Sequence, residues 1–188
     1  MIGGCAESFA ALYDRRQAGV YRFALRMTGS EAFAEDVTQD VFLALTREGC
    51  QFDPGRGSVR SYLYGMARHR VLRRLERERA HVPFEGDEGV TLGELPRGTD
   101  DPFADLAREE TVSLVRQAVL SLPTHFREVI VLCHLQEMNY AEAAEVVSCP
   151  VGTVRSRLAR AREMLTGKLR ALRGPTLNEG AVKAGRAI

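Results

Sequence analysis

The stretch Asn139–Leu165, NYAEAAEVVSCPVGTVRSRLARAREML, has the spacing of two helices joined by a tight turn. Asn139 can cap the first helix, and Glu142, three residues later, can complete a capping box. Pro150 ends this helix, because the residue before a proline is driven towards extended backbone geometry. Its apolar stripe is expected at Ala141, Ala144 and Val147. The stretch therefore predicts a short helix, a turn and a second helix.

The second helix of this stretch divides into a buried face and an outward face. Apolar spacing predicts the buried face at Val154, Leu158, Ala161 and Leu165. The opposite face holds small or polar residues, with arginines on its flanks: Gly152, Ser156, Ala159 and Glu163, beside Arg155, Arg157, Arg160 and Arg162. This pattern is typical of a helix-turn-helix that reads the major groove of DNA. The alternative is an ordinary helical hairpin with a solvated basic face.

Length and composition describe a globular protein of one or two domains. The chain has 188 residues, of which 45% are hydrophobic, enough for a real core. No run of eighteen apolar residues predicts a membrane span, so no direct membrane insertion is expected. The first residues, MIGGCAESFAALYDRR, do not resemble a signal peptide, and we expect a cytoplasmic protein.

The cysteines predict neither a disulfide framework nor a metal site. Cys5, Cys50, Cys133 and Cys149 are scattered without paired spacing. We therefore expect free thiols that pack as small hydrophobic groups, with no metal and no cofactor.

Charge is distributed unevenly, although the net charge is only +1. Residues 56–79 hold eight Arg against two Glu, and residues 151–173 hold seven Lys or Arg against one Glu. Between them, residues 80–110 hold nine acidic residues against two Arg. Two basic blocks separated by an acidic block predict two nucleic-acid contacts on one chain.

The remaining apolar spacing is helical throughout, and no strand signal is present. We expect further helices at residues 8–27, 31–47, 58–79, 102–121 and 126–137, with Ser30, Ser58 and Thr124 among the caps. The predicted fold is all-α, with two small helical domains at 8–80 and 102–173. An acidic, flexible linker at 81–101 joins them, and a disordered tail at 174–188 follows the helix-turn-helix domain.

Two helices of the first domain carry patterned polar faces. Asp36, Gln39 and Asp40 share one face of the helix 31–47. This face is either a solvated acidic surface or a docking site for a basic protein surface, since no catalytic partner accompanies it. The helix 58–79 mixes many arginines with Tyr62, Tyr64 and His69. Basic residues among aromatics suit single-stranded nucleic acid, whose bases stack and whose phosphates pair.

Three strings in this order resemble a bacterial RNA polymerase sigma factor of the extracytoplasmic-function kind. LPTHFREVIVLCHLQEMNYAEAAEVVSCPVGTVRSRLARARE, residues 122–163, resembles region 4 of that family. AEDVTQDVFLAL, residues 34–45, and SVRSYLYGMARHRVLRRLERER, residues 58–79, resemble parts of region 2. The resemblance covers nearly all of residues 8–172. It implies promoter-specific transcription initiation with core RNA polymerase and promoter DNA.

The resemblance also implies roles for individual residues. Asp36, Gln39 and Asp40 match positions that dock on the clamp helices of the largest polymerase subunit, and the second-largest subunit is a further partner. The implied readers of the −10 element are Phe52, Arg56, Ser58, Arg60, Tyr62, His69, Arg70, Arg73, Arg74 and Arg77. The implied readers of the −35 element are Thr153, Arg155, Ser156, Arg157, Ala159, Arg160 and Arg162. An anti-sigma factor is the implied inhibitor.

Two other functions compete with this interpretation. A stand-alone helix-turn-helix regulator would explain the second domain but would leave the Arg/Tyr helix and the Asp36 face unused. An enzyme is the weaker alternative, because no metal spacing and no pairing of nucleophile and base is present. The acidic linker is either a solvated tether or an occupant of a nucleic-acid channel on the polymerase.

Overall fold

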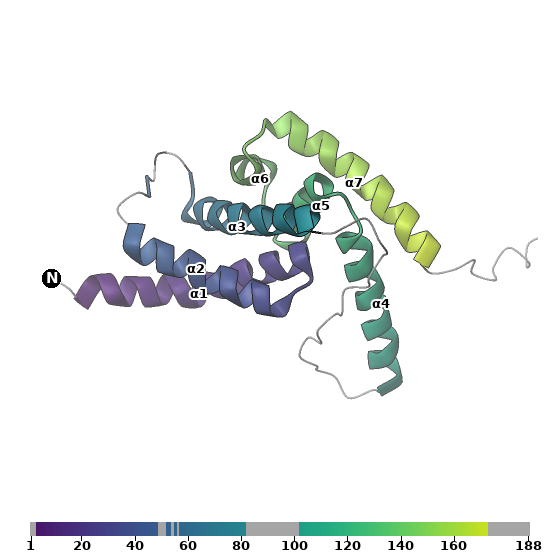
Figure 1. Ribbon diagram of the computed structural model, residues 1–188, viewed down its shortest axis with the longest axis horizontal. Coiled ribbons are helices and arrows are strands. Elements are labelled where there is room, and N and C mark those ends of the chain that lie inside the picture. Colours follow the sequence, from purple (N-terminus) through teal and green to yellow (C-terminus); the bar gives the residue numbers. More distant parts are fainter. Residues whose placement is uncertain (1–2, 49–51, 54, 56, 82–101, 173–188) are drawn as a thin grey trace, which may run out of the picture.

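The computed structural model describes residues 3–48, 52–53, 55, 57–81 and 102–172. Within these residues the protein consists of seven α-helices and one π-helical turn, without a strand (Figure 1). The predicted all-α fold is confirmed. None of the described helices has the length and the apolar character needed to cross a membrane.

The N-terminal domain is formed by three helices, α1 (Gly3–Thr28), α2 (Glu31–Glu48) and α3 (Val59–His81). Ser30 Oγ accepts the backbone N–H of Phe33 at 3.3 Å, and Ser58 Oγ accepts that of Ser61 at 3.0 Å, so both serines cap helices as predicted. The apolar stripes of the three helices meet in a core whose members are almost fully buried: Val20, Phe23, Met27, Val37, Val41, Leu63, Ala67 and Val71.

The C-terminal domain contains α4 (Pro102–Leu120), α5 (Thr124–Ile130), the π-helical turn η2 (Val131–Leu135), α6 (Tyr140–Val147) and α7 (Val151–Leu172). The helix-turn-helix consists of α6 and α7. Both bonds of the predicted capping box are present: Asn139 Oδ1 accepts the N–H of Glu142 at 2.9 Å, and Glu142 Oε2 accepts that of Asn139 at 3.1 Å. Ser148, with a φ of 53°, ends α6.

Several local predictions were wrong. Helix α5 begins at Thr124, with Pro123 in the cap position, because the Pro123 carbonyl accepts the N–H groups of Phe126 and Arg127. The predicted helix 126–137 instead ends in the π-helical turn at Leu135. Helix α1 starts at Gly3, five residues earlier than expected. In α6 the buried alanines are Ala143 and Ala144, whereas Ala141 is exposed.

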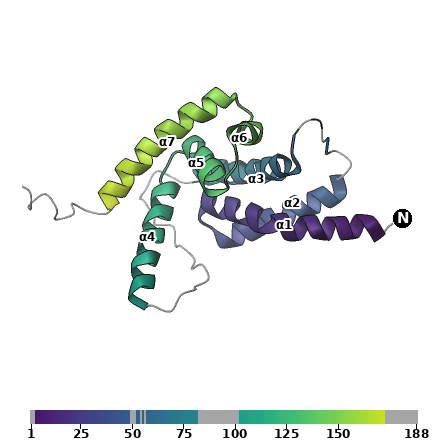
Figure 2. The same ribbon diagram turned by 180° about the vertical axis from the view of Figure 1, so that it is seen from behind.

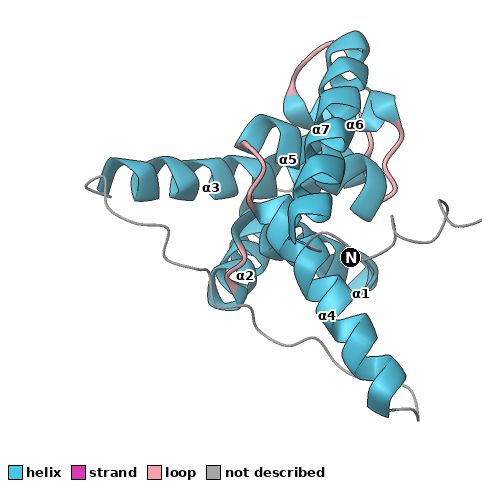
Figure 3. Ribbon diagram, turned by 90° about the vertical axis from the view of Figure 1, so that its right-hand side faces the viewer, coloured by secondary structure: helices cyan, strands magenta, loops and turns pink. Residues whose placement is uncertain are grey.

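The two domains pack against each other and share one continuous apolar core. Helix α3 lies between α1 and α2 on one side and α5 and α6 on the other (Figures 1 and 2). Figure 3 shows α3 extending to the left of the group formed by α5, α6 and α7, with α1, α2 and α4 below. The core therefore runs from Phe23 and Leu63 of the first domain to Leu132 and Val154 of the second.

Polar contacts cross this domain interface, and three of them join an arginine side chain to a backbone carbonyl group at a helix end. Arg26 donates to the Leu135 carbonyl at 2.7 Å, Arg60 donates to the Gln136 carbonyl, and Arg127 donates to the Met27 carbonyl. Each acceptor is at or just beyond the C-terminal end of a helix or helical turn in the opposite domain. Carbonyl groups there have no intrahelical partner and carry partial negative charge, which favours a cation. The arginines of each domain thus cap helices of the other.

A buried ion pair completes the interface. Glu128 of α5 is only 2% exposed, and its Oε2 is 3.2 Å from Arg68 Nη2 on α3. Burial raises the pKa of Glu128, and the nearby Arg68 offsets part of that rise. Glu128 therefore binds its proton more tightly when the domains are packed than when its carboxyl group is exposed to water.

Replacing Asn139 with Ala should destabilise the C-terminal domain by about 1 kcal/mol, because the N–H of Glu142 loses its capping acceptor. Replacing Asn139 with Ser keeps an acceptor and should cost only a few tenths of that amount. Chemical denaturation followed by circular dichroism measures both variants. Equal losses in the two variants would contradict a capping role.

Arg68→Ala should separate the domains at neutral pH, because the Glu128 carboxylate would stay buried without its partner, at a cost on the order of 1–3 kcal/mol. Glu128→Gln should keep them packed, since it removes the buried charge. In the wild type, acidification from neutral pH towards the ordinary glutamate pKa of 4.5 should favour packing, and a rise in pH through the raised pKa should disfavour it.

Small-angle X-ray scattering measures this as the radius of gyration. Arg73→Ala, an exposed position on the same helix, is the control and should match the wild type. The Glu128→Gln variant should lose the pH dependence that Glu128 provides. An Arg68→Ala protein as compact as the control would show that the pair does not hold the domains together.

Candidate nucleic-acid interface

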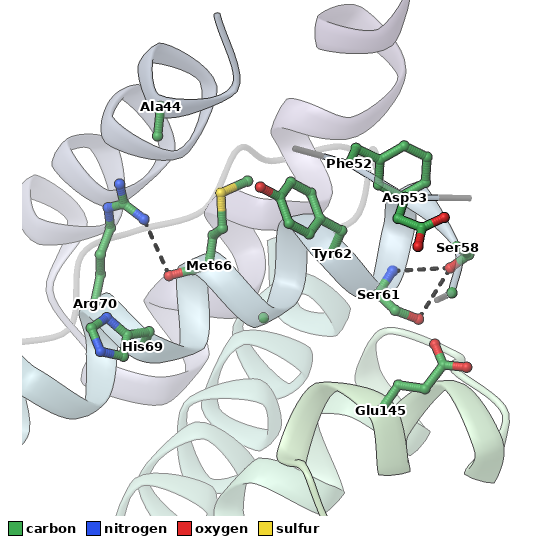
Figure 4. Close-up of a pocket in the computed structure, with 12 residues that line it drawn as sticks. Ala44, Phe52, Asp53, Ser58, Ser61, Tyr62, Met66, His69, Arg70 and Glu145 are labelled. Carbon is green, nitrogen blue, oxygen red and sulfur yellow. Dashed lines mark hydrogen bonds between the residues drawn. The ribbon is translucent and has the colours of Figure 1, made fainter. Parts of the chain in front are cut away.

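A pocket of about 540 Å³ opens beside α3, where the end of the loop before α3 faces α2 (Figure 4). The rings of Phe52 and Tyr62 lie on its wall with centroids 5.6 Å apart and their planes tilted by 57°. Ser58, His69 and Arg70 line the same pocket. Aromatic faces beside hydroxyl, imidazole and guanidinium groups suit an unpaired base and its phosphate.

The structure thus brings together five of the ten predicted −10 readers and places four others elsewhere. Arg73, Arg74 and Arg77 continue along α3 beyond the pocket and are exposed. Arg74 donates to Glu78 at 2.6 Å and lies over the Phe33 ring. Arg56 lies outside the described residues.

The sequence placed Arg60 and Tyr64 on a helix face open to nucleic acid. In the packed arrangement both side chains contact the C-terminal domain instead. Arg60 is bound to the Gln136 carbonyl, and its Nη1 is 3.9 Å from Glu142 Oε2. Tyr64 is 4% exposed and donates its hydroxyl to Gln136 Oε1 at 2.8 Å. Both side chains face the C-terminal domain rather than solvent, because α6 and the segment after η2 cover this side of α3.

The C-terminal domain also supplies one wall of the pocket. Glu145 of α6 lines it, opposite the loop glycine Gly57. Gly57 has a φ of 150°, and a Cβ there would lie 2.8 Å from Glu145 Oε2. A carboxylate at this position repels phosphate, so the pocket accepts a nucleotide less well while α6 is in place.

Sequence reasoning missed Ala44, Asp53, Ser61, Met66 and Glu145 as pocket residues. Helical spacing could have identified Ser61 and Met66 as pocket residues, because they share a face with Ser58, Tyr62 and His69. No local pattern identifies Ala44 or Glu145, because they come from other helices.

Helix α7 presents the predicted outward face. Val154, Leu158 and Ala161 are buried, Leu165 is half-buried, and Arg155, Ser156, Ala159, Arg160 and Arg162 are exposed. Thr153 and Arg157 are half-buried at its edges. A major groove admits an α-helix, and small residues between guanidinium groups suit close approach to base edges.

Two of these arginines already have neighbours within the domain. The Arg155 guanidinium lies 5.8 Å from the centroid of the Tyr140 ring, and Arg162 Nε donates to His134 Nε2 at 2.9 Å. Burial and the charge of Arg162 lower the pKa of His134, which keeps the imidazole neutral as an acceptor. These contacts orient Arg155 and Arg162 at opposite ends of the face.

The predicted docking face on α2 is exposed, but its three members differ. Asp36 and Gln39 make no ion pair or hydrogen bond with any described residue. Asp40, whose side chain is 66% exposed, has its Oδ2 3.6 Å from Arg70 Nε. Asp40 therefore links the docking face to the pocket on α3.

Cys133 and Cys149 are free thiols and half-buried, and burial raises the pKa of Cys133. Cys50 lies outside the described residues, as does the side chain of Cys5. Among the residues that the structure describes, no three His, Cys, Asp or Glu side chains gather as metal ligands do.

The family models for sigma-70 region 2 and sigma-70 region 4 match residues 12–81 and 113–165. The chain is 31% identical over 180 residues to the ECF RNA polymerase sigma factor SigW of Bacillus subtilis (strain 168), which covers 90% of this chain and 92% of SigW. It is 32% identical over 162 residues to the ECF RNA polymerase sigma factor SigC of Mycobacterium tuberculosis (strain CDC 1551 / Oshkosh), covering 86% and 83% of the two chains.

Two solved structures have a similar fold. The sigma factor RpoE of Bartonella quintana, in complex with the anti-sigma factor NepR, superposes with a TM-score of 0.69 at 23% identity over 87% of this chain and 97% of RpoE. CnrH, in complex with the cytosolic domain of CnrY, gives 0.66 at 28% identity over 88% and 90% of the two chains. With regions 2 and 4 matched in order and relatives above 30% identity aligned over most of their length, the chain belongs to the extracytoplasmic-function (ECF) sigma factors of the sigma-70 family.

Proposed function

We propose that this protein is a sigma factor that binds core RNA polymerase and directs it to promoters by reading a −10 and a −35 element. The observation that carries the proposal is the presence of two readers in one family member: a pocket with aromatic walls on α3 and an outward Arg-flanked face on α7. The protein acts in the cytoplasm, through binding alone, without catalysis or cofactor.

The two readers bind different forms of DNA. Helix α7 reads duplex DNA, where Arg donors suit guanine O6 and N7 in the major groove. The pocket on α3 holds an unpaired base, and preferential binding of the unpaired state shifts the melting equilibrium towards open DNA. Core polymerase docks on the α2 face through Asp36, Gln39 and Asp40, with contacts to its largest and second-largest subunits.

Reading both elements requires the two domains to separate. Elements centred about 35 and about 10 base pairs upstream of the start lie roughly 85 Å apart along B-DNA, at 3.4 Å per base pair. Helix α7, at 22 residues, is only about 33 Å long, and its domain packs directly on α3. We infer that the packed arrangement is a closed form. Separation withdraws Glu145 from the pocket and frees Arg60 and Tyr64.

An anti-sigma factor is the proposed inhibitor. The related RpoE and CnrH folds were each solved with a second protein, described for RpoE as an anti-sigma factor. A partner that binds the closed form would hold the readers apart from DNA by population shift.

Run-off transcription tests the function as a whole. The purified protein with core polymerase, on a library of genomic fragments, should start transcripts at a common pair of upstream sequences. Core polymerase alone is the control. Specific binding of the protein to duplex DNA without polymerase, combined with no promoted start sites, would favour a stand-alone regulator instead.

Asp36→Arg should weaken binding to core polymerase by about tenfold, because it reverses a charge in the docking face. Asp14→Arg makes the same charge change at an exposed position of α1, outside the docking face, and should leave the affinity unchanged. Biolayer interferometry with immobilised core polymerase measures both. Equal affinities for the two variants would remove the docking role from Asp36.

Arg155→Ala and Arg160→Ala should each relax the preference at one position of the −35 element, at a cost of about 1–3 kcal/mol. Arg157→Ala and Arg162→Ala should weaken all sequences alike and lower the salt slope by about one, as expected of phosphate contacts. The assay is transcription from −35 elements randomised at each position, at two salt concentrations. Arg170→Ala, exposed near the end of α7, is the control. An unchanged preference profile in both Arg155→Ala and Arg160→Ala would rule out base readout by this face.

A further inference from the structure

A second cavity, of about 320 Å³, lies at the domain interface, on the side of α3 that faces α1 rather than α2. The proposed reading of promoter DNA does not use it. Four arginines line it, Arg15, Arg16 and Arg22 of α1 and Arg60 of α3, together with Gln136 and Glu137, which follow the π-helical turn.

The cavity is strongly basic and its cations are largely unpaired. Four guanidinium groups face a single carboxylate, that of Glu137. Arg15, Arg16 and Arg22 form no hydrogen bond or ion pair with any residue in the described part of the chain. Clustered guanidinium groups repel one another, so the site favours an anion that they can share.

Two buried hydrogen-bond donors at this cavity have no acceptor among the described residues. They are Arg16 Nε and Gln136 Nε2. Gln136 is 6% exposed, and its Oε1 is already held by the Tyr64 hydroxyl at 2.8 Å, so its amide is fixed in place. Buried donors nearly always have a partner, and an acceptor seated in this cavity satisfies both.

Gly19 allows the cavity walls to come this close. A Cβ at Gly19 would lie 2.7 Å from the Tyr64 hydroxyl and 3.9 Å from Gln136 Oε1. A side chain at this position would therefore displace the Tyr64 hydroxyl, so the glycine allows α1 to approach α3 closely. The approach brings Arg15, Arg16 and Arg22, which surround Gly19 on α1, to the same cavity as Arg60.

We propose that this cavity binds a compact oligophosphate, such as pyrophosphate or the phosphate end of a nucleotide, and that the bound anion holds the two domains together. Guanidinium forks match phosphate oxygens in geometry, and charge-assisted bonds of this kind are the strong ones. The cavity far exceeds the share of one water, about 30 Å³, which fits a group larger than a single ion. Its lining is polar, so it recognises phosphate and not a base.

The location argues for a free anion over a nucleic-acid strand. Leu135, Gln136 and Glu137 belong to the C-terminal domain, so the cavity is complete only in the packed arrangement. A ligand that binds this arrangement alone stabilises it by mass action. Because the packed arrangement cannot read both promoter elements, the bound anion should inhibit transcription. This consequence rests on the domain separation proposed above, whereas binding of the anion does not.

Isothermal titration of the full chain with pyrophosphate and tripolyphosphate, at constant ionic strength and without magnesium, tests the site. One saturable site is expected, and Arg16→Gln and Arg22→Gln should each weaken it by about tenfold or more. Arg47→Gln, an exposed position in the last turn of α2, is the matched control and should leave the affinity unchanged. No binding at millimolar pyrophosphate, or binding that ignores both substitutions, overturns the proposal.

Two further measurements test whether the anion holds the domains together and whether the bound phosphate belongs to a free anion or to a nucleic acid. Pyrophosphate should lower the radius of gyration of the Arg68→Ala protein towards the wild-type value, and binding without this change overturns the role in domain packing. A single-stranded oligodeoxynucleotide should bind with little dependence on Arg16 and Arg22. Loss of oligonucleotide binding equal to that of pyrophosphate in both variants would assign the site to nucleic acid and overturn the free-anion proposal. Run-off transcription by the Arg16→Gln variant, whose cavity should not hold the anion, tests the promoter function separately.

Discussion

Burial of α3 on two sides is the constraint on which the rest of the structure depends. Its apolar residues Leu63, Ala67 and Val71 pack against α1 and α2, as in any three-helix domain. The C-terminal domain then covers a second side, where Tyr64 is buried against Gln136 and Arg68 pairs with Glu128. One helix thus serves the core of the first domain, the interface with the second and the candidate nucleic-acid pocket.

The chemistry of the interface suits a contact that forms and breaks. Arg26, Arg60 and Arg127 donate to carbonyl groups at helix ends, and water can satisfy both partners when the domains part. Glu128 likewise regains hydration on separation, although burial is what raises its pKa in the packed form. An interface made only of apolar side chains would leave exposed hydrophobic surface on each domain after separation. The polar contacts reduce that exposure.

The same contacts explain why the packed and DNA-reading arrangements compete. Glu145 provides a carboxylate wall to the pocket on α3, and Arg60 is bound to the segment after η2. A nucleic-acid strand in the pocket needs the opposite charge pattern. The outward face of α7, by contrast, is open in the packed arrangement, so closure affects the α3 reader more than the α7 reader.

Local patterns in the sequence predicted most of the helices, most caps and the buried and outward faces of α7. Ser30, Ser58 and the Asn139–Glu142 box were readable because capping depends on residues three apart. The buried stripe of α7 was readable because periodicity fixes which side chains share a face. The roles of the predicted site residues and the domain boundaries stay predictions.

The contacts of α3 with the C-terminal domain became known only from the packing of the two domains. Tyr64 and Arg60 belong by pattern to a basic, aromatic helix for nucleic acid, yet they bind Gln136 from the other domain. In the sequence Glu128 looks like an ordinary surface acid of a helix, and only the structure shows that it pairs with Arg68. The acceptors of the interface arginines are backbone carbonyls, which carry no signature in the sequence. Helix periodicity reports local neighbours, whereas these partners are brought together by the packing of whole domains, so no local pattern could identify them.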